Sequence, residues 1–350
     1  MAFEFISQQL AQQQAESRYR QRICVAEQSG RALVVNGKSY LNFSSNDYLG
    51  LNNHSLINKA MQEGIDKFGI SASASSLITG YHYAHQALEA DICQWLNKPK
   101  CLLFTSGFAA NSGIFQALGQ ANSHFWLDKL SHASMIDGAL ASKAKLKRFR
   151  HNDITQLKHL LANNENLDHI IASEGVFSMD GDQADVVGLA DLAKQHSALL
   201  YLDDAHSIGV IGEQGQGSVS LAPADIVMAT FGKAIASSGA FVACNEQLFE
   251  YFVNFSRHYI YSTAMSPALA WATRKSINII QTEQWRRDKI IELSALLRQS
   301  LTSNIKLIAT SSSIHALVVG NEKSALLASE KLKAKGIWLT AIRPPTVPRG

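Results

Sequence analysis

The sequence contains few cysteines, and none has the spacing of a redox or metal-binding pair. Its 350 residues include four cysteines, and no two of them form a Cys-x-x-Cys motif. Cys101 and Cys244 lie in apolar runs typical of strands. We therefore interpret the cysteines as buried thiols of a cytoplasmic protein, and not as disulfides or metal ligands.

Long apolar runs and strong net charge are also missing. No run is long enough to cross a bilayer, and the Gln-rich residues 1–22 have no apolar signal core. The 32 basic residues nearly balance the 29 acidic ones, and the basic stretch 143–150 alternates with apolar residues, as an exposed edge of the fold does. We expect a soluble, cytoplasmic protein whose partners are neither nucleic acid nor membrane.

Several motifs of common enzyme classes do not occur. The glycines within residues 212–217 do not form Gly-x-Gly-x-x-Gly, and no Gly-x-Ser-x-Gly is present. Asp180-Gly181-Asp182 lacks the remaining oxygen ligands of a calcium loop, and His82 and His85 have no ligand neighbours. The sequence therefore argues against a dinucleotide site, a serine hydrolase elbow and a metal centre.

The N-terminal part predicts a helix and a hairpin. Residues 4–22 carry a sparse apolar stripe, which indicates a helix. Two alternating segments, 32–35 and 40–43, flank the turn Asn36-Gly37, which is typical of a β-hairpin. We treat residues 1–46 as an N-terminal helix and hairpin segment.

From about residue 80, short apolar strands alternate with helices. Helices are predicted at 83–97 and 188–196, with a further one beginning at Ser106. Strands are predicted at 101–105, 125–127, 170–173, 199–202, 226–230 and 240–244. This alternation predicts an α/β fold with a mainly parallel central sheet covered by helices on both faces. We expect it to form a large domain over residues 47–284, because 46% hydrophobic content supports a large core.

Residues 285–350 predict a smaller α+β domain. A long helix is expected at 285–301, followed by a strand at 314–319, a helix at 324–335 and a strand at 337–342. The pair Pro344-Pro345 follows shortly before Gly350, so this small C-terminal domain is expected to be incomplete.

Two predicted strands end in residues that indicate a pyridoxal phosphate (PLP) site. Asp203-Asp204-Ala205-His206 follows the strand 199–202, and Thr230-Phe231-Gly232-Lys233 ends the strand 226–230. Ligands bind at the carboxyl ends of strands in open α/β sheets. PLP enzymes carry the cofactor on a lysine as a Schiff base and place a carboxylate beside the pyridine nitrogen, which keeps that nitrogen protonated. On the pattern alone, Asp203 or Asp204 could supply that carboxylate. The plainer alternative is a capping Asp, a loop His and a solvated Lys.

Further segments suit the same pocket. The small residues 236–240 near Lys233 leave room for a cofactor and would desolvate the amine, which lowers its pKa. Ser106-Gly107-Phe108 follows a strand and begins a helix, whose free N–H groups and dipole suit a phosphate, although a simple N-cap looks the same in sequence. Residues 173–182 follow another strand and include a hydroxyl that could reach a cofactor oxygen.

Taken in order along the chain, these motifs resemble those of the α-oxoamine synthases, a family of fold-type I PLP-dependent transferases. The matching stretches are 41–50, 79–81, 85–89, 104–111, 131–134, 148–153, 174–182, 203–217, 230–233, 261–263 and 341–348. Together they span essentially the whole chain, so the resemblance covers both the large and the small domain.

The resemblance implies roles for individual residues. The catalytic residues would be Lys233, Asp203 and His132. Lys233 would bind the cofactor covalently and remove the α-proton, and Asp203 would pair with the pyridine nitrogen. His132 would stack on the ring and orient substrate and cofactor, and could also act as an acid. The other cofactor contacts would come from Gly107, Phe108, Ser178, His206 and Thr230, and from Ser262 and Thr263 of the partner subunit in a homodimer with shared active sites. Arg20 and Thr346 would contact substrate.

The resemblance also implies an acyltransferase of biotin biosynthesis. Its reaction would be the decarboxylative condensation of L-alanine with a pimeloyl thioester, carried by coenzyme A or by an acyl carrier protein. The Tyr81 loop and Arg343-Pro344-Pro345-Thr346 favour this reaction over that of a glycine C-acetyltransferase. Family members continue with another strand, a substrate-binding arginine and a helix, so a PLP-binding chain that is inactive without this end is a further alternative.

Overall fold

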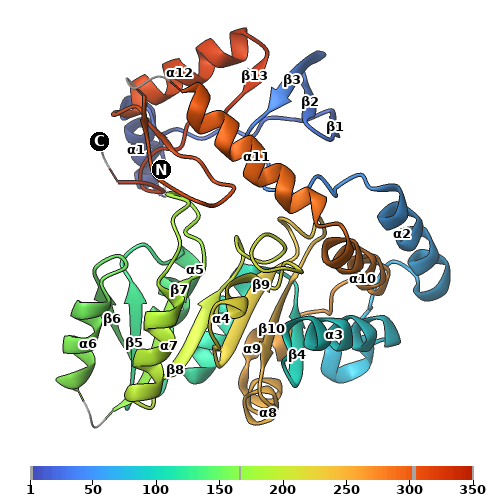
Figure 1. The fold of residues 1–350 in the computed structure, drawn as a ribbon, viewed down its shortest axis with the longest axis vertical. Helices are drawn as coiled ribbons and strands as arrows, with labels where there is room; N and C mark the ends of the chain where they lie inside the picture. Colours follow the sequence, from blue (N-terminus) through green and yellow to red (C-terminus); the bar gives the residue numbers. More distant parts are fainter. Residues whose placement is uncertain (1–2, 165–166, 302–304, 349–350) are drawn as a thin grey trace.

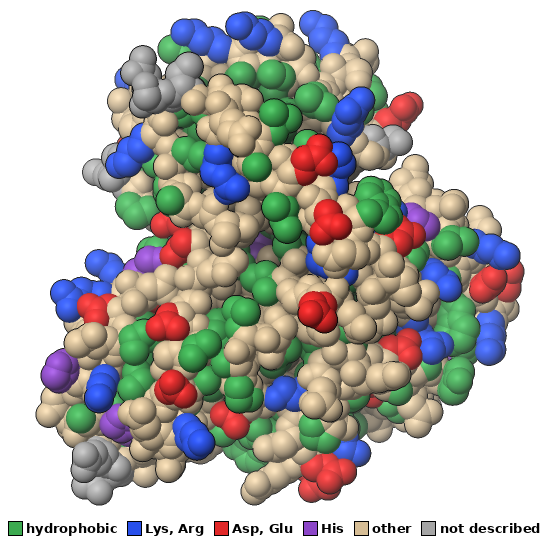
Figure 2. Space-filling model, viewed as in Figure 1, with side chains coloured by type: hydrophobic (Ala, Val, Ile, Leu, Met, Phe, Trp, Pro, Cys, Tyr) green, Lys and Arg blue, Asp and Glu red, His purple; other side chains and the backbone are tan. Residues whose placement is uncertain are grey.

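The computed structural model describes residues 3–164, 167–301 and 305–348. Figure 1 shows a large lobe built on a central sheet and a small lobe that contains both ends of the described chain. Figure 2 shows acidic and basic side chains interspersed over most of one face, with Lys and Arg side chains along the top of the small lobe. No helix of the described residues is both long and apolar enough to cross a membrane.

The large lobe is built on a seven-stranded sheet in the order β4-β10-β9-β8-β7-β5-β6. Its strands are β4 (Lys100–Phe104), β5 (Ser123–Asp128), β6 (Lys145–Phe149), β7 (Asp168–Glu174), β8 (Leu199–Asp203), β9 (Ile226–Thr230) and β10 (Ala240–Cys244). Strands β9, β8, β7, β5 and β6 are mutually parallel, and β10 runs antiparallel to both of its neighbours. The predicted, mainly parallel sheet is confirmed, and the basic stretch 143–150 contains its edge strand β6.

Helices cover both faces of this sheet. The helices of the large lobe are α2 (Ser55–Phe68), α3 (Tyr83–Leu96), α4 (Gly107–Leu118), α5 (Ala133–Leu140), α6 (Ile154–Ala162), α7 (Val186–Gln195), α8 (Glu246–Phe255), α9 (Arg257–Tyr261) and α10 (Pro267–Thr282), with short helical turns at Ser76–Gly80 and Gly217–Ser220. Helix α2 packs against α10, away from the sheet (Figure 1). Successive residues of β8 point into different cores: Leu200 and Leu202 belong to one apolar cluster and Tyr201 to the other. This alternation explains the nearly continuous apolar strands, because both of their faces are buried.

The small lobe joins segments from opposite ends of the chain. Its elements are α1 (Glu4–Ala15), β1 (Glu27–Ser29), β2 (Ala32–Val35), β3 (Lys38–Asn42), α11 (Trp285–Ser300), β11 (Lys306–Leu307), β12 (Leu317–Val318), α12 (Glu322–Ala334) and β13 (Ile337–Trp338). One sheet has the order β1-β2-β3-β13, and β13 pairs with β3 in parallel. The proposed boundaries at residues 46 and 284 stay predictions.

The predicted hairpin is confirmed, but the predicted first helix is too long. Asn36 and Gly37 have φ angles of 49° and 71°, the left-handed conformation that a tight hairpin turn of this type requires. Helix α1 ends at Ala15, not at residue 22, and Ser17 has a φ of 57°. No side chain of α1 is buried. Helical propensity alone rarely sustains a short helix, because packing supplies most of its stability.

The C-terminal strands are also shorter than predicted. The expected strands 314–319 and 337–342 each contain a single two-residue strand, β12 and β13. Apolar residues extend beyond them, but no neighbouring described strand continues the hydrogen-bonding ladder, since the register of each pair covers two residues.

Candidate active site

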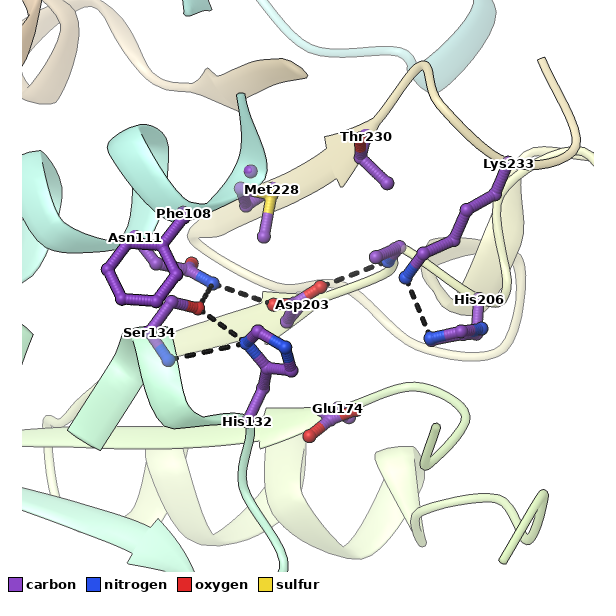
Figure 3. A pocket seen from close by; sticks show the side chains of 12 residues that line it. Phe108, Asn111, His132, Ser134, Glu174, Asp203, His206, Met228, Thr230 and Lys233 are labelled. Atoms are coloured by element: carbon purple, nitrogen blue, oxygen red, sulfur yellow. Dashed lines mark hydrogen bonds between the residues drawn. The ribbon is translucent and has the colours of Figure 1, made fainter. Parts of the chain in front are cut away.

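A pocket of about 200 Å³ lies at the carboxyl ends of the parallel strands (Figure 3). Its lining comes from the start of α4, the start of α5, and the ends of β7, β8 and β9 with the residues that follow them. The lining residues are Gly107, Phe108, Asn111, His132, Ser134, Glu174, Asp203, Ala205, His206, Met228, Thr230 and Lys233. The sheet therefore places the site where an open α/β fold binds its ligands.

Of the two neighbouring aspartates, Asp203 faces the pocket. Its carboxylate accepts hydrogen bonds from Asn111 Nδ2 at 2.8 Å and from the backbone N–H of Ala205 at 3.0 Å. Asp204 is fully buried and does not line the pocket. It accepts a hydrogen bond from the backbone N–H of Ser218 at 2.7 Å, and burial raises its pKa to about 6. Asp203 is thus the carboxylate available to a ligand, and Asp204 supports the neighbouring loop.

The Lys233 amine lies in a part-buried, polar corner of the pocket. Its Nζ lies 2.7 Å from His206 Nε2, and the Tyr48 hydroxyl lies 2.6 Å from His206 Nδ1. Burial lowers the pKa of Lys233. The nearby Asp203 and Glu174 carboxyl groups raise it, but by less than burial lowers it. Burial and the nearby Lys233 lower the pKa of His206 to about 2, so this imidazole is neutral at physiological pH. A lysine of lowered pKa is suited to act as a nucleophile and as a base.

The start of helix α4 forms an anion-binding corner. Ser106 caps the helix by accepting a bond from Ala109 N at 3.1 Å, and the backbone N–H groups of Gly107 and Phe108 belong to the first turn, before the intrahelical bonds begin. A Cβ placed on Gly107 would meet the Thr230 side chain at 3.6 Å, so strand β9 approaches this turn closely. The N–H groups, the helix dipole and the Thr230 hydroxyl together suit a phosphate.

These groups fit PLP. The pocket offers an anion-binding helix start, an amine of lowered pKa, and a buried carboxylate for a ring nitrogen. Glu174 adds an open hydrogen-bonding position, because its Oε1 is buried and has no partner among the described residues. Burial and the neighbouring Asp203 raise the pKa of Glu174, so this carboxyl group holds a proton beside Asp203 more readily than an exposed glutamate does.

The pocket brings together most of the residues predicted from sequence. Those lining it are Gly107, Phe108, His132, Asp203, His206, Thr230 and Lys233. Ser178, Ser262 and Thr263 lie outside the lining, and their predicted roles stay predictions. Arg20 and Thr346 also lie outside it, but they meet each other: Arg20 Nη2 donates to Thr346 Oγ1 at 3.0 Å across 326 positions of sequence.

Sequence reasoning missed four polar residues at or beside the pocket: Tyr48, Asn111, Ser134 and Glu174. Helical spacing could have indicated Asn111, which lies four residues after Gly107 and therefore on the same face of α4. No local pattern marks Tyr48, because its partner His206 is 158 residues away.

A charged cluster supports the turn that follows β7. His151 Nδ1 lies 2.9 Å from Asp128 Oδ1, and His151 Nε2 lies 2.7 Å from Asp182 Oδ2. Asp128 also accepts from the backbone N–H of Leu130, which leads to His132. Burial alone would lower the pKa of His151, but hydrogen bonds and charge from Asp128 and Asp182 outweigh it and raise the pKa.

Because two carboxylates raise the pKa of His151, we expect the protein to lose stability as pH rises above the ordinary histidine value of about 6.5. Because the pKa of His151 is higher in the folded protein than in the unfolded chain, where it is about 6.5, its stabilisation is complete below the unfolded value. It is lost as pH rises through the folded value. We expect His151→Gln to lower the free energy of unfolding by about 1–3 kcal/mol below the unfolded pKa of about 6.5, and to flatten the fall of that free energy as pH rises through the folded pKa. Urea unfolding across the window measures both effects. His159→Gln, at an exposed position of α6, is the control; an unchanged slope in His151→Gln would contradict the assignment.

The sequence of this chain is similar to one enzyme family over most of its length, and to individual proteins that share a single name. The chain matches the family Aminotransferase class I and II over residues 38–350. It is 43% identical over 349 residues to an 8-amino-7-oxononanoate synthase of Photobacterium profundum, covering 98% of this chain and 89% of that protein. It is 44% identical over 336 residues to the Salmonella typhimurium protein of the same name, covering 95% and 87%.

Solved structures share the fold. A serine palmitoyltransferase of S. paucimobilis with a bound PLP–myriocin aldimine superposes with a TM-score of 0.93 at 26% identity, covering 99% of this chain and 90% of that one. An 8-amino-7-oxononanoate synthase of Francisella tularensis superposes with a TM-score of 0.76 at 29% identity, covering 88% and 89%.

Proposed function

Because the chain belongs to the class I and II aminotransferase family of PLP-dependent enzymes, and to its 8-amino-7-oxononanoate synthase group, we propose that it condenses L-alanine with a pimeloyl thioester. The products are 8-amino-7-oxononanoate, carbon dioxide and the free thiol, and the reaction is a step of biotin biosynthesis. The observation that carries the proposal is the convergence of Lys233, Asp203 and the start of α4 on one pocket, in a chain 43% identical to proteins of that name.

Each pocket residue has a task in this reaction. Bound PLP supplies an electron sink for the carbanion formed at the amino acid Cα. Lys233 Nζ, with its lowered pKa, would take the proton from that carbon and return it after decarboxylation. Asp203 would hold a proton on the pyridine nitrogen by ionic pairing, and the N–H groups of Gly107 and Phe108 would bind the phosphate.

Residues outside the pocket complete the proposal. The Arg20 guanidinium, joined to Thr346, would contact the acyl substrate, because arginine recognises carboxylates by charge-assisted hydrogen bonds. Ser178 would reach the cofactor oxygen beside His206. Ser262 and Thr263 would act across a homodimer interface. In support, Tyr261, which precedes Ser262, and Ile78, which follows the Ser75–Thr263 bridge by three residues, are more than 70% exposed, as apolar side chains covered by a second copy would be. The cytoplasmic location stays a prediction.

A substrate matrix tests the proposal. We expect alanine with pimeloyl-CoA to give the highest kcat/KM among alanine, glycine and serine combined with pimeloyl, acetyl and palmitoyl thioesters. Alanine should exceed glycine by about 10-fold or more, the discrimination that a well-fitted methyl group provides. Thiol release and mass spectrometry of the product measure this.

Other outcomes identify the alternatives. Faster turnover of glycine with acetyl-CoA would indicate a glycine C-acetyltransferase. Faster turnover of serine with palmitoyl-CoA would indicate an enzyme like the palmitoyltransferases of the same fold. Cofactor-loaded protein that turns over no pair would indicate the inactive chain.

A further inference from the structure

A buried chain of hydrogen bonds connects the floor of the pocket to His132. The Tyr201 hydroxyl meets Asn111 Oδ1 at 2.5 Å, and Asn111 Nδ2 meets both Asp203 Oδ2 and Ser134 Oγ at 2.8 Å. Ser134 Oγ in turn lies 2.7 Å from His132 Nδ1. Four of these five residues are at most 5% exposed; His132, at the N-cap of α5, is the exposed end (Figure 3). The role of this chain of bonds in catalysis rests on the proposed function, whereas the bonds themselves do not.

Counting donors and acceptors fixes the direction of every bond. The Asp203 carboxylate can only accept, so Asn111 must present its NH₂ group to it and its carbonyl oxygen to Tyr201. The Tyr201 hydroxyl therefore donates to that oxygen. The second hydrogen of Asn111 Nδ2 points to Ser134 Oγ, so Ser134 accepts this bond and keeps its own hydrogen for another partner.

The remaining partner of Ser134 is His132. The Ser134 side chain is fully buried, and among the described residues the acceptor within reach of its hydroxyl hydrogen is His132 Nδ1. The backbone N–H of Ser134 also points at Nδ1, at 3.3 Å. Two donors aimed at one nitrogen require a lone pair there, so the proton of the neutral ring must sit on Nε2.

We propose that Ser134 and Asn111 are positioning residues that fix the tautomer of His132, so that the ring presents an Nε2–H donor to the pocket. In Figure 3 the ring lies between Asp203 and Glu174, with its second nitrogen turned away from Ser134. A neutral His132 in this state donates to an oxygen of the bound amino acid or cofactor and does not accept a proton. The base for the Cα proton is then Lys233.

The same chain links His132 to Asp203. One amide group, that of Asn111, holds both the Asp203 carboxylate and the Ser134 hydroxyl. Fully paired buried networks of this kind hold a single arrangement, because a rotated amide would leave buried groups unpaired. A change at Asp203 therefore reaches the His132 ring through two side chains.

The test is to measure the ring tautomer in the PLP-loaded enzyme. Long-range ¹H–¹⁵N spectra of ¹⁵N-histidine protein, assigned with His132→Asn, report which nitrogen carries hydrogen in the pH range where the ring is neutral. We expect Nδ1 to be unprotonated and Nε2 protonated in the unmodified enzyme and in Ser134→Thr. In Ser134→Ala only the longer and weaker bond from the backbone N–H, at 3.3 Å, remains on Nδ1. The two shifts should therefore move toward each other, as in a mixture of tautomers.

Ser131→Ala is the matched control. Ser131 is buried in the same segment, and its hydroxyl has no hydrogen-bond partner among the described residues, so its removal should leave the tautomer unchanged. For the amino acid substrate we expect kcat/KM to fall about 3- to 10-fold in Ser134→Ala and to recover in Ser134→Thr, since one neutral hydrogen bond is lost and regained.

Two results would overturn the inference: a proton on Nδ1 in the unmodified enzyme, or an unchanged tautomer in Ser134→Ala. Neither depends on which thioester the enzyme uses. An enzyme that makes 8-amino-7-oxononanoate with Nδ1 protonated would refute the positioning role and leave the proposed function intact. An enzyme that shows the expected tautomer but does not favour alanine with pimeloyl-CoA would refute the proposed function and leave the positioning role intact.

Discussion

Lys233→Ala is expected to lower turnover by about 10⁴-fold or more, because one side chain serves both as the covalent anchor of the cofactor and as the base, and a positioned acid–base group alone contributes up to about 10⁴. Fold stability should change little, since the amine is a half-buried group whose pKa is already lowered by desolvation. Borohydride reduction followed by peptide mass spectrometry should find PLP on the peptide containing Lys233 in the unmodified enzyme.

Lys143→Ala provides the matched control, because Lys143 is exposed at the edge of the large lobe. It should retain full activity and normal labelling. Labelling of a different lysine in the unmodified enzyme, or substantial turnover by Lys233→Ala, would refute the assignment of the anchor.

Asp203→Asn is expected to lower kcat by about 10²- to 10³-fold, the usual cost of removing one preorganised electrostatic contact. The substitution keeps the shape of the side chain but removes the charge that would hold a proton on the pyridine nitrogen. It also turns an acceptor into an amide opposite Asn111, which disturbs the bond now 2.8 Å long. Steady-state kinetics and the absorption spectrum of the bound cofactor measure the effect.

The neighbouring Asp204→Asn distinguishes a loss of charge at the pocket from a loss of buried charge in general. Asp204 does not line the pocket and accepts from Ser218 N, so we expect its replacement to reduce stability more than kcat. A larger fall in kcat for Asp204→Asn than for Asp203→Asn would reverse the roles of the two aspartates.

The parts of the fold that were predictable are those that local patterns determine. Buried parallel strands appear as short apolar runs, so β8 and β9 were located within one residue, and the residues after them predicted the site because parallel strands end at one edge. The hairpin turn at Asn36-Gly37 was predictable because few residues adopt two successive left-handed conformations.

The rest depends on contacts between distant segments. Asn111 and Asp203 are 92 positions apart, and nothing near Asn111 in sequence shows that its amide holds a carboxylate. The choice between Asp203 and Asp204 likewise required the structure, because both follow the same strand and only the path of the loop decides which one faces the pocket. The extent of α1 was mispredicted for a related reason, since the periodicity of a helix does not reveal whether anything packs against it.

The pairing of β3 with β13 has a consequence for how the protein is made. The two strands, and the bond from Thr340 N to Ser44 Oγ across 296 positions, join segments that leave the ribosome at opposite ends of synthesis. Strands β4 to β10, which build the cofactor side of the site, lie within residues 100–244 and are complete much earlier. Pairings between such distant segments form late, because the entropy cost of closing the long intervening loop comes before the strands make any stabilising contact. We therefore expect a nascent chain to acquire its cofactor cradle first and the Arg20–Thr346 contact last, so that cofactor capture precedes the ability to hold an acyl substrate.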